Sequence, residues 1–235
     1  MRQEPQRYKL LSVIVPVYNE HNTVGEIVRR MRQVELPLER EIVIVDDGST
    51  DGTDKVLNLV EDSTVRVVRH PGNRGKGAAV RTGLQAARGD IVLIQDADLE
   101  YDPEDWPRLL APILKGRAQV VYGSRYRGER ETSSIRHYVA DRSLALFASL
   151  LFNTAISDIQ TCFKVFDRDV VDSMTIESDG FDLEPELTAK LLRARHKIYE
   201  VPVSFSGRTE DEGRKFTWRD QLEAMRTLVK YRVRR

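Results

Sequence analysis

The stretch that decides the fold is IVLIQDADLE, at residues 91–100. Its four leading aliphatic residues predict a strand buried on both faces, as in the centre of a parallel sheet. Two carboxylates, Asp96 and Asp98, follow the strand directly, and in an extended chain they would point the same way. Neighbouring carboxylates repel unless a cation lies between them, so the pair is typical of a divalent metal site beside a phosphate. A solvated turn after a strand is the alternative interpretation.

The chain around this stretch alternates predicted strands with predicted helices. The links between them are short, which favours right-handed βαβ units and a mostly parallel sheet covered by helices on both faces. We expect strands at residues 10–17, 41–46, 65–69, 91–94 and 118–122, and helices at about 23–31, 51–61, 76–87 and 103–115.

Three of these strands end in polar side chains. In such sheets ligands bind at the carboxyl ends of the strands, so polar groups gathered there predict a binding site. The groups are, in chain order, Tyr18, Asn19 and Glu20, then Asp46 and Asp47, then Asp96 and Asp98.

The pattern changes after Gly123. A polar, arginine-rich loop is followed by a long apolar helix at 136–154, and Pro202 marks the strand at 198–205 as an edge strand. The other expected elements are a strand at 161–166 and helices at 184–195 and 217–231. Because no repeat or low-complexity linker interrupts the chain, we predict one domain over residues 1–235.

Composition excludes several classes of protein. Lys and Arg together number 37, as do Asp and Glu, so no overall field points to nucleic acid. The single cysteine, Cys162, excludes an internal disulfide and fits a reducing compartment. We expect neither a signal peptide nor a membrane-spanning segment.

Two common nucleotide-binding motifs are absent. There is no G-x-x-x-x-G-K-[ST] loop, and the first strand is not followed by G-x-G-x-x-G. The glycine-rich residues 72–77 come after the third strand, where a simple turn and a phosphate contact are both open.

A series of motifs resembles a known family when taken in order. The segments are PVYNE at 16–20, VDDGSTDGT at 45–53, NRGKGAA at 73–79, DADL at 96–99, GSR at 123–125 and EVP at 200–202. Together they resemble family 2 glycosyltransferases of the GT-A fold, most nearly dolichol-phosphate mannose synthases and related polyprenyl-phosphate hexosyltransferases. The matches span about residues 12–218, nearly the whole chain.

The resemblance implies an α/β, Rossmann-like GT-A fold that binds a nucleotide sugar. The single domain would comprise a nucleotide-sugar half at about 10–123 and a C-terminal acceptor half at about 124–235. The implied nucleotide-sugar ligands are Pro16, Tyr18, Glu20, Asp46, Asp47, Lys76 and Asp96. Asp46 would contact the edge of the base, and Asp47 would lie near the ribose or the floor of the site.

The same resemblance implies a metal site. Asp96 and Asp98 would hold Mg²⁺ or Mn²⁺ against the diphosphate, with Asp98 the more direct ligand. Glu100 stands where the family often has glutamine, and as a third metal ligand it leaves the preferred metal open. One of Glu184 and Glu186, in the F-x-x-E-x-E segment, would lie near the sugar.

The acceptor implied by the resemblance is a lipid phosphate. A phosphate is already ionised and needs positioning by cations, which guanidinium groups do well through paired N–H donors. The residues concerned are Arg125, Arg136, Arg208 and Lys215, and Arg208 would lie on a mobile loop that closes over the donor. The implied catalytic residues are Asp98, Arg125 and Arg208. Solvated surface charge is the alternative for each arginine.

We therefore expect a metal-dependent, inverting transfer of a hexose to polyprenyl or dolichyl phosphate, with GDP-mannose favoured as donor and UDP-glucose next. A family 2 transferase with a hydroxyl acceptor would need a catalytic base, and no unambiguous one is evident in the acceptor half. The other rivals are a silent nucleotide-sugar-binding partner subunit and a sugar nucleotidylyltransferase.

A membrane-bound acceptor implies contact with a membrane. The apolar stripe at residues 144–156 and the basic tail at 230–235 could form a docking face, with packing of the stripe on the sheet as the alternative. We expect peripheral contact, assisted where needed by a membrane-anchoring partner protein. The expected location is cytoplasmic, at the cytoplasmic face of a membrane.

Overall fold

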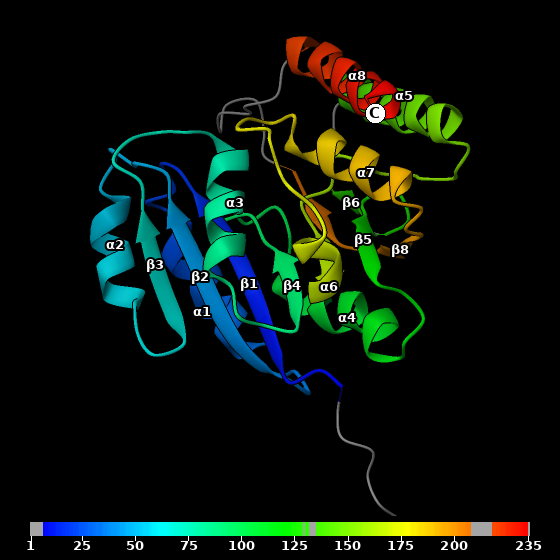
Figure 1. Cartoon of the computed structure of the whole chain (residues 1–235). Coiled ribbons are helices and arrows are strands. Elements are labelled where there is room, and N and C mark those ends of the chain that lie inside the picture. The colour runs from blue at the N-terminus through cyan, green and yellow to red at the C-terminus, as the bar shows by residue number, and fades with distance from the viewer. Residues whose placement is uncertain (1–6, 129, 132–134, 208–217, 235) are drawn as a thin grey trace, which may run out of the picture.

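The computed structural model describes residues 7–128, 130–131, 135–207 and 218–234. Of residues 130–131, 135–137 and 218–220 it describes the backbone alone. Its centre is a seven-stranded sheet in the order β3-β2-β1-β4-β7-β5-β8 (Figure 1). The strands are β1 (Leu10–Val17), β2 (Glu39–Asp46), β3 (Val65–Arg69), β4 (Ile91–Ile94), β5 (Val120–Ser124), β7 (Lys164–Asp167) and β8 (Ile198–Pro202).

The sheet is mostly parallel, as predicted. β1 pairs in parallel with β2 and β4, β2 with β3, and β5 with β8. The exception is β7, which lies antiparallel between β4 and β5. β8 occupies an edge, as Pro202 indicated, because a proline cannot donate to a further strand.

Helices cover both faces of the sheet, with α3 in front of β1 and β2 and α1 behind them (Figure 1). In chain order the helices are α1 (Val24–Gln33), α2 (Thr53–Val60), α3 (Lys76–Ala86), the 3₁₀ turn η1 (Pro103–Asp105), α4 (Trp106–Leu114), α5 (Ile135–Phe152), α6 (Arg168–Asp172), α7 (Leu183–Arg193) and α8 (Trp218–Val233). All of the helices that we predicted are found, and α6 was not anticipated.

The central strands are buried because their residues are apolar on both faces. Every residue of β4 is buried, and the hydrophobic side chains from all parts of the fold join one core cluster. Helix α3 approaches the sheet closely at Gly83, where a Cβ atom would overlap the side chain of Ile14. This close approach brings the first turn of α3 near the ends of β1 and β2.

The long apolar helix α5 does not pack mainly on the sheet. Packing on the sheet was the alternative to a membrane-docking face for its apolar stripe. The helix packs against α8 and α7, and the three helices lie together above the sheet in Figure 1. Leu144 is fully buried there, whereas Leu146 and Leu150 are exposed. No helix in the described ranges combines the length and the apolar character needed to cross a membrane.

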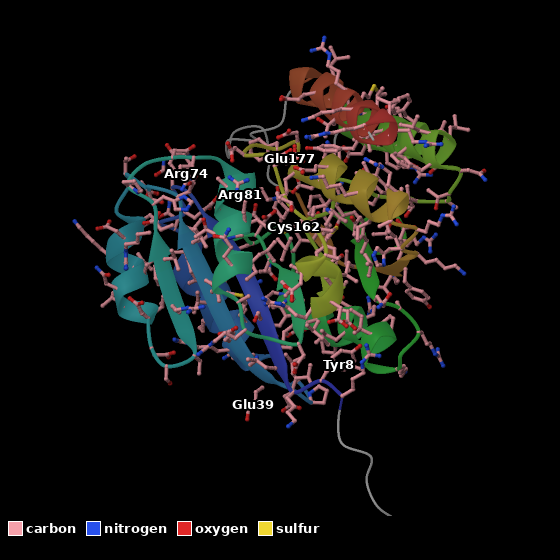
Figure 2. All side chains as sticks on the ribbon, viewed as in Figure 1. Tyr8, Glu39, Arg74, Arg81, Cys162 and Glu177 are labelled. Carbon is pink, nitrogen blue, oxygen red and sulfur yellow. The ribbon has the colours of Figure 1, made fainter. Side chains whose placement is uncertain are left out.

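Different side chains lie at the two ends of the strands of the sheet. Tyr8 and Glu39, beside the starts of β1 and β2, lie at the lower edge in Figure 2, and Arg74 and Arg81 lie at the upper edge with α3. A small second sheet pairs β6 (Arg130–Glu131) with β9 (Phe205–Ser206). The Ser206 N–H donates to the Glu100 carbonyl at 2.9 Å, so β9 adjoins the segment after the central strand.

Candidate active site

A cavity of about 460 Å³ opens at the carboxyl ends of β1, β2 and β4. Among the residues that the structure describes, seven carboxylates and only two cationic side chains line it. The acids are Glu20, Asp47, Asp96, Asp98, Glu100, Asp141 and Glu184, and the cations are Lys76 and Arg125. An anionic ligand such as a diphosphate would therefore need additional positive charge in this cavity.

Most of the residues that the sequence pointed to meet in this cavity. Its wall includes Pro16, Tyr18, Glu20, Asp47, Lys76, Asp96, Asp98, Glu100 and Arg125. Asp46 does not line it, because its carboxylate accepts the Ser49 N–H at 3.0 Å and stabilises the turn after β2. Contact of Asp46 with a base stays a prediction. Arg208 and Lys215 lie outside the described residues, and of Arg136 only the backbone in α5 is described.

Asp47 organises the glycine-rich loop before α3. Its carboxylate accepts the backbone N–H groups of Arg74 and Gly75, at 3.0 and 2.7 Å, and contacts His70 Nδ1 at 2.6 Å. His70 is buried and also contacts Thr82 through Nε2 at 2.9 Å. These two amides are engaged by the protein. Asn73, Gly75 and Lys76 still line the cavity, so a phosphate contact from residues 72–77 stays a prediction.

Lys76 lies between two carboxylates from different elements. Its ammonium is 2.9 Å from Asp96 Oδ1 and 3.0 Å from Glu184 Oε1. Burial opposes the charge of Lys76, but Asp96 and Glu184 outweigh that effect and raise the pKa of Lys76 well above its usual value. Burial likewise opposes the charge of Asp96, and Lys76 nevertheless lowers the pKa of that carboxyl. Lys76 and Asp96 are therefore both charged at neutral pH.

Glu184 and Glu186 lie in different surroundings, although both are on α7. Glu184 lines the cavity, whereas Glu186 is fully buried away from it. The Glu186 carboxylate accepts the N–H groups of Glu177 and Ser178, at 2.8 and 2.6 Å, and pairs with Lys190 at 2.5 Å. Glu186 therefore stabilises the segment before α7. Of the two, only Glu184 lines the cavity, and its place near the sugar stays a prediction.

The acidic residues after β4 suit a hard divalent ion only in part. Asp96, Asp98 and Glu100 all line the cavity, and carboxylate oxygens are the ligands that Mg²⁺ and Mn²⁺ prefer. In the described part of the chain, however, no three acidic, histidine or cysteine side chains gather closely enough to hold an ion. An ion here would complete its coordination with oxygens of the ligand, so the three predicted metal ligands stay a prediction.

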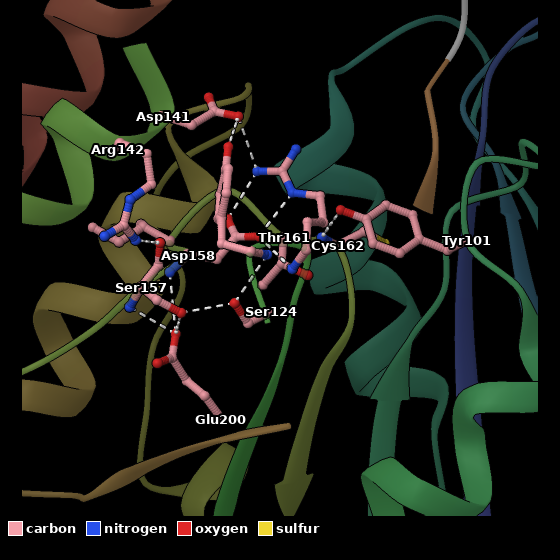
Figure 3. A network of polar contacts seen from close by, with 12 residues as sticks. Tyr101, Ser124, Asp141, Arg142, Ser157, Asp158, Thr161, Cys162 and Glu200 are labelled. Carbon is pink, nitrogen blue, oxygen red and sulfur yellow. Dashed lines mark hydrogen bonds and ion pairs between the residues drawn. The ribbon is translucent and has the colours of Figure 1, made fainter. Parts of the chain in front are cut away.

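Arg125 is held by a buried network of polar contacts (Figure 3). Its guanidinium donates two bonds of 2.8 Å to the Asp158 carboxylate and lies 3.2 Å from Asp141 Oδ2. Tyr126 donates its O–H to the same Asp141 oxygen at 2.6 Å. Burial works against the charge of Arg125, but Asp158 in particular raises the pKa of Arg125 well above its usual value. The alternative of a solvated surface arginine is therefore wrong for Arg125.

A second set of contacts fixes Asp158 in place (Figure 3). The Glu200 carboxylate accepts the Ser157 N–H at 2.8 Å and the Asp158 N–H at 3.1 Å. Arg127 pairs with Glu200 at 3.1 Å, and Arg142 donates to the Ser157 carbonyl at 2.8 Å. The guanidinium of Arg125 thus has its direction set by residues from the loop after α5 and from β8.

A second buried lysine, Lys164 on β7, lies close enough to Lys76 and Glu184 for their charges to act on it. Its ammonium donates to the carbonyls of Ile159 and Thr161, and no carboxylate of the described residues pairs with it. Burial is the main effect and lowers the pKa of Lys164 from 10.5 to about 8.

This lowered pKa predicts a dependence of stability on pH. Between pH 8 and 10.5 the unfolded chain holds a proton on Lys164 that the folded chain has lost, so the free energy of unfolding rises with pH. Compared with a Lys164→Met variant, the wild type should gain up to about 3 kcal/mol across that range. Urea unfolding of both proteins at several pH values measures the difference, and a difference that stays constant would contradict the lowered pKa.

The chain is similar to known proteins both in sequence and in structure. A family model described as glycosyl transferase family 2 matches residues 12–175, more than half of the chain. The chain belongs to glycosyl transferase family 2. The match covers the strand ends that form the cavity and ends before α7 and α8.

The curated relatives of this family 2 chain include proteins that are named for two different transferase activities. The undecaprenyl-phosphate 4-deoxy-4-formamido-L-arabinose transferase of Pseudomonas fluorescens Pf0-1 is 32% identical over 89% of this chain and 61% of its own length. The dolichol-phosphate mannosyltransferase of Pyrococcus furiosus is 31% identical over 87% of this chain and 58% of its own length. The chain thus spans about three fifths of the length of these relatives.

Solved structures support the fold. Glucosyl-3-phosphoglycerate synthase from Mycobacterium tuberculosis, crystallised with Mn²⁺, UDP and glucosyl-3-phosphoglycerate, superimposes with a TM-score of 0.73. It is 22% identical, and the superposition covers 96% of this chain and 80% of that one. The GT-A fold that the motifs implied is therefore confirmed.

Several site residues of this family 2 chain were not found from its sequence. His70 is one of them: β2 and β3 run in register with Asp46 beside Arg69, which places Asp47 next to His70. Strand register could have revealed that contact. Glu200 lies in the EVP motif, but its bond to Ser157, like the ion pair of Asp141 with Arg125, joins segments that only the packing of β8 and α5 brings together.

Proposed function

We propose that this chain is an inverting, metal-dependent glycosyltransferase that moves a sugar from a nucleotide sugar to polyprenyl or dolichyl phosphate. The favoured donor is GDP-mannose, with UDP-glucose next. The product would be a lipid-linked phosphosugar.

The cavity supports the donor part of the proposal. Tyr18 and Glu20 after β1 and Asp47 after β2 line the cavity, and the base and ribose would bind beside them. Asp98 and Glu100, which follow β4, line it as well, and the diphosphate would lie beside them with Mg²⁺ or Mn²⁺. A bound divalent ion there would neutralise the charge that develops on the leaving diphosphate.

One observation carries the choice of acceptor. From the acceptor half, the described wall of the cavity contains two carboxylates, Asp141 and Glu184. Both are ion-paired, Asp141 with Arg125 and Glu184 with Lys76. A hydroxyl acceptor needs a base to take its proton, whereas an ionised phosphate attacks without one. A cavity whose acceptor-side carboxylates are already engaged by cations therefore favours a phosphate acceptor.

The names of the relatives agree with this choice. The bacterial relatives are named for undecaprenyl phosphate and the archaeal one for dolichol phosphate, so both acceptors are polyprenyl phosphates. The named sugars differ, one being a modified arabinose and the other mannose. A donor screen for this chain should therefore include both types of sugar as well as glucose.

We also propose peripheral contact with a membrane through α5 and α8. Leu146 and Leu150 on α5 and Val233 on α8 expose 61%, 75% and 71% of their surface. Lys230 and Arg232 lie exposed on α8. Apolar side chains beside basic ones are typical of a helix at an anionic lipid surface. A membrane-anchoring partner protein could cover part of the same surface.

A transfer assay tests the proposed function. Purified protein would be incubated with Mg²⁺ or Mn²⁺ and polyprenyl phosphate in detergent, with GDP-mannose, UDP-glucose and a nucleotide-linked 4-deoxy-4-formamido-L-arabinose in turn. We expect a lipid-linked sugar from one donor, identified by mass spectrometry. Hydrolysis of a donor without any lipid product would contradict the proposed acceptor.

A further inference from the structure

Lys76 contacts both oxygens of the first carboxylate in D-A-D. Its ammonium lies 2.9 Å from Asp96 Oδ1 and 3.2 Å from Asp96 Oδ2, and it also pairs with Glu184. The side chains of Lys76 and Glu184 are only 17% and 9% exposed. The ammonium therefore occupies the space beside Asp96 that a metal ion sharing this carboxylate would need.

We propose that Lys76 is a resident cation that competes with the divalent ion for Asp96 in the ligand-free protein. Metal binding would then be weak until a nucleotide diphosphate adds negative charge to the cavity. The inference rests on the proposed use of a metal and a nucleotide sugar at this site. It implies that the donor and the metal bind together.

Charge provides the physical reason. A divalent ion on Asp96 would lie beside a buried ammonium, and like charges repel strongly where water is excluded. The two negative charges of a diphosphate would offset that repulsion. Because coupling between two ligands is reciprocal, whatever makes the diphosphate strengthen metal binding also makes the metal strengthen diphosphate binding.

The backbone limits how Lys76 can respond. Helix α3 is attached at its first turn, where the N–H groups of Gly77 and Ala78 donate to the Asp179 carbonyl at 2.8 and 3.3 Å. Lys76 therefore yields Asp96 by a change of side-chain conformation and not by a shift of the helix. Glu184 remains as its second partner, so the ammonium stays paired when Asp96 turns to the ion.

The test is a Mn²⁺ titration of nucleotide-free protein, followed by the electron paramagnetic resonance signal of free Mn²⁺. We expect Lys76→Met to bind Mn²⁺ more tightly than the wild type by about tenfold or more. Lys76→Gln, whose amide can still donate to Asp96, should show the same direction of change. The matched control is Lys55→Met, because Lys55 is exposed on α2 and away from the cavity.

A double variant assigns the effect to Asp96. Adding Asp96→Asn to Lys76→Met should remove the gain in Mn²⁺ affinity. Thermal unfolding gives a second measurement, since Mn²⁺ should raise the melting temperature of Lys76→Met but not that of the wild type. Equal Mn²⁺ affinity in the wild type and both single variants, or a gain that survives Asp96→Asn, would overturn the proposal.

This outcome is independent of the transfer assay. The titration contains neither sugar donor nor lipid, so its failure would leave the proposed acceptor standing. Conversely, a protein that fails to glycosylate polyprenyl phosphate could still show the exchange of Lys76 for Mn²⁺ at Asp96.

Discussion

Replacing Arg125 with methionine is expected to reduce the free energy of unfolding by about 3–5 kcal/mol, because the change leaves buried carboxylates without their cation. The side chain of Asp158 is fully buried and accepts three hydrogen bonds from Arg125. The side chain of Asp141 is nearly buried and forms an ion pair with the same guanidinium. Urea unfolding of the variant and the wild type measures the loss.

Two further variants show whether buried charge is the cause. Arg29→Met removes an exposed ion pair with Glu26 on α1 and should change the free energy of unfolding far less than Arg125→Met does. Adding Asp158→Asn to Arg125→Met should recover part of the lost stability, because it removes one of the unpaired charges. If Arg125→Met costs no more than Arg29→Met, the network does not stabilise the fold.

Replacing Asp98 with asparagine is expected to lower the rate of sugar transfer on the order of a thousandfold, which corresponds to ~4 kcal/mol of transition-state stabilisation. The change keeps the size of the side chain and removes the charge that would hold the divalent ion against the leaving diphosphate. Initial rates at saturating donor and acceptor measure the effect.

A nearby aspartate provides the matched control. Asp102 accepts the Glu104 N–H at 3.0 Å as the cap of η1 and is not part of the cavity wall. Asp102→Asn should therefore leave the transfer rate close to that of the wild type. A similar small effect for Asp98→Asn would show that Asp98 does not hold the metal.

The sequence was sufficient to predict the elements that local patterns control. The run Ile91–Ile94 followed by Asp96 and Asp98 placed the central strand and its site, and β1 and β2 followed from the same kind of pattern. Alternation of strands and helices then predicted the mostly parallel sheet. These features depend on neighbours in the chain, and so they can be inferred without knowing the tertiary structure.

What the sequence did not predict depends on contacts between distant residues. The pairing of Lys76 with Glu184 joins α3 to α7, and the pairing of Arg125 with Asp158 joins β5 to the loop after α5. The antiparallel position of β7 between β4 and β5 likewise could not be predicted, because the short hydrophobic sequence of β7 does not indicate the direction of the strand. Each is decided by packing, which hydrophobic periodicity does not record.

The proposed phosphate acceptor is tested most directly by a comparison of two matched lipids. Polyprenyl phosphate and the corresponding polyprenol, of equal chain length and in the same detergent, would be offered to the protein with its active donor and Mn²⁺. Our account predicts a lipid-linked sugar from polyprenyl phosphate and none from the polyprenol. Glycosylation of the polyprenol at a comparable rate would contradict it, because the enzyme would then have a base able to deprotonate a hydroxyl.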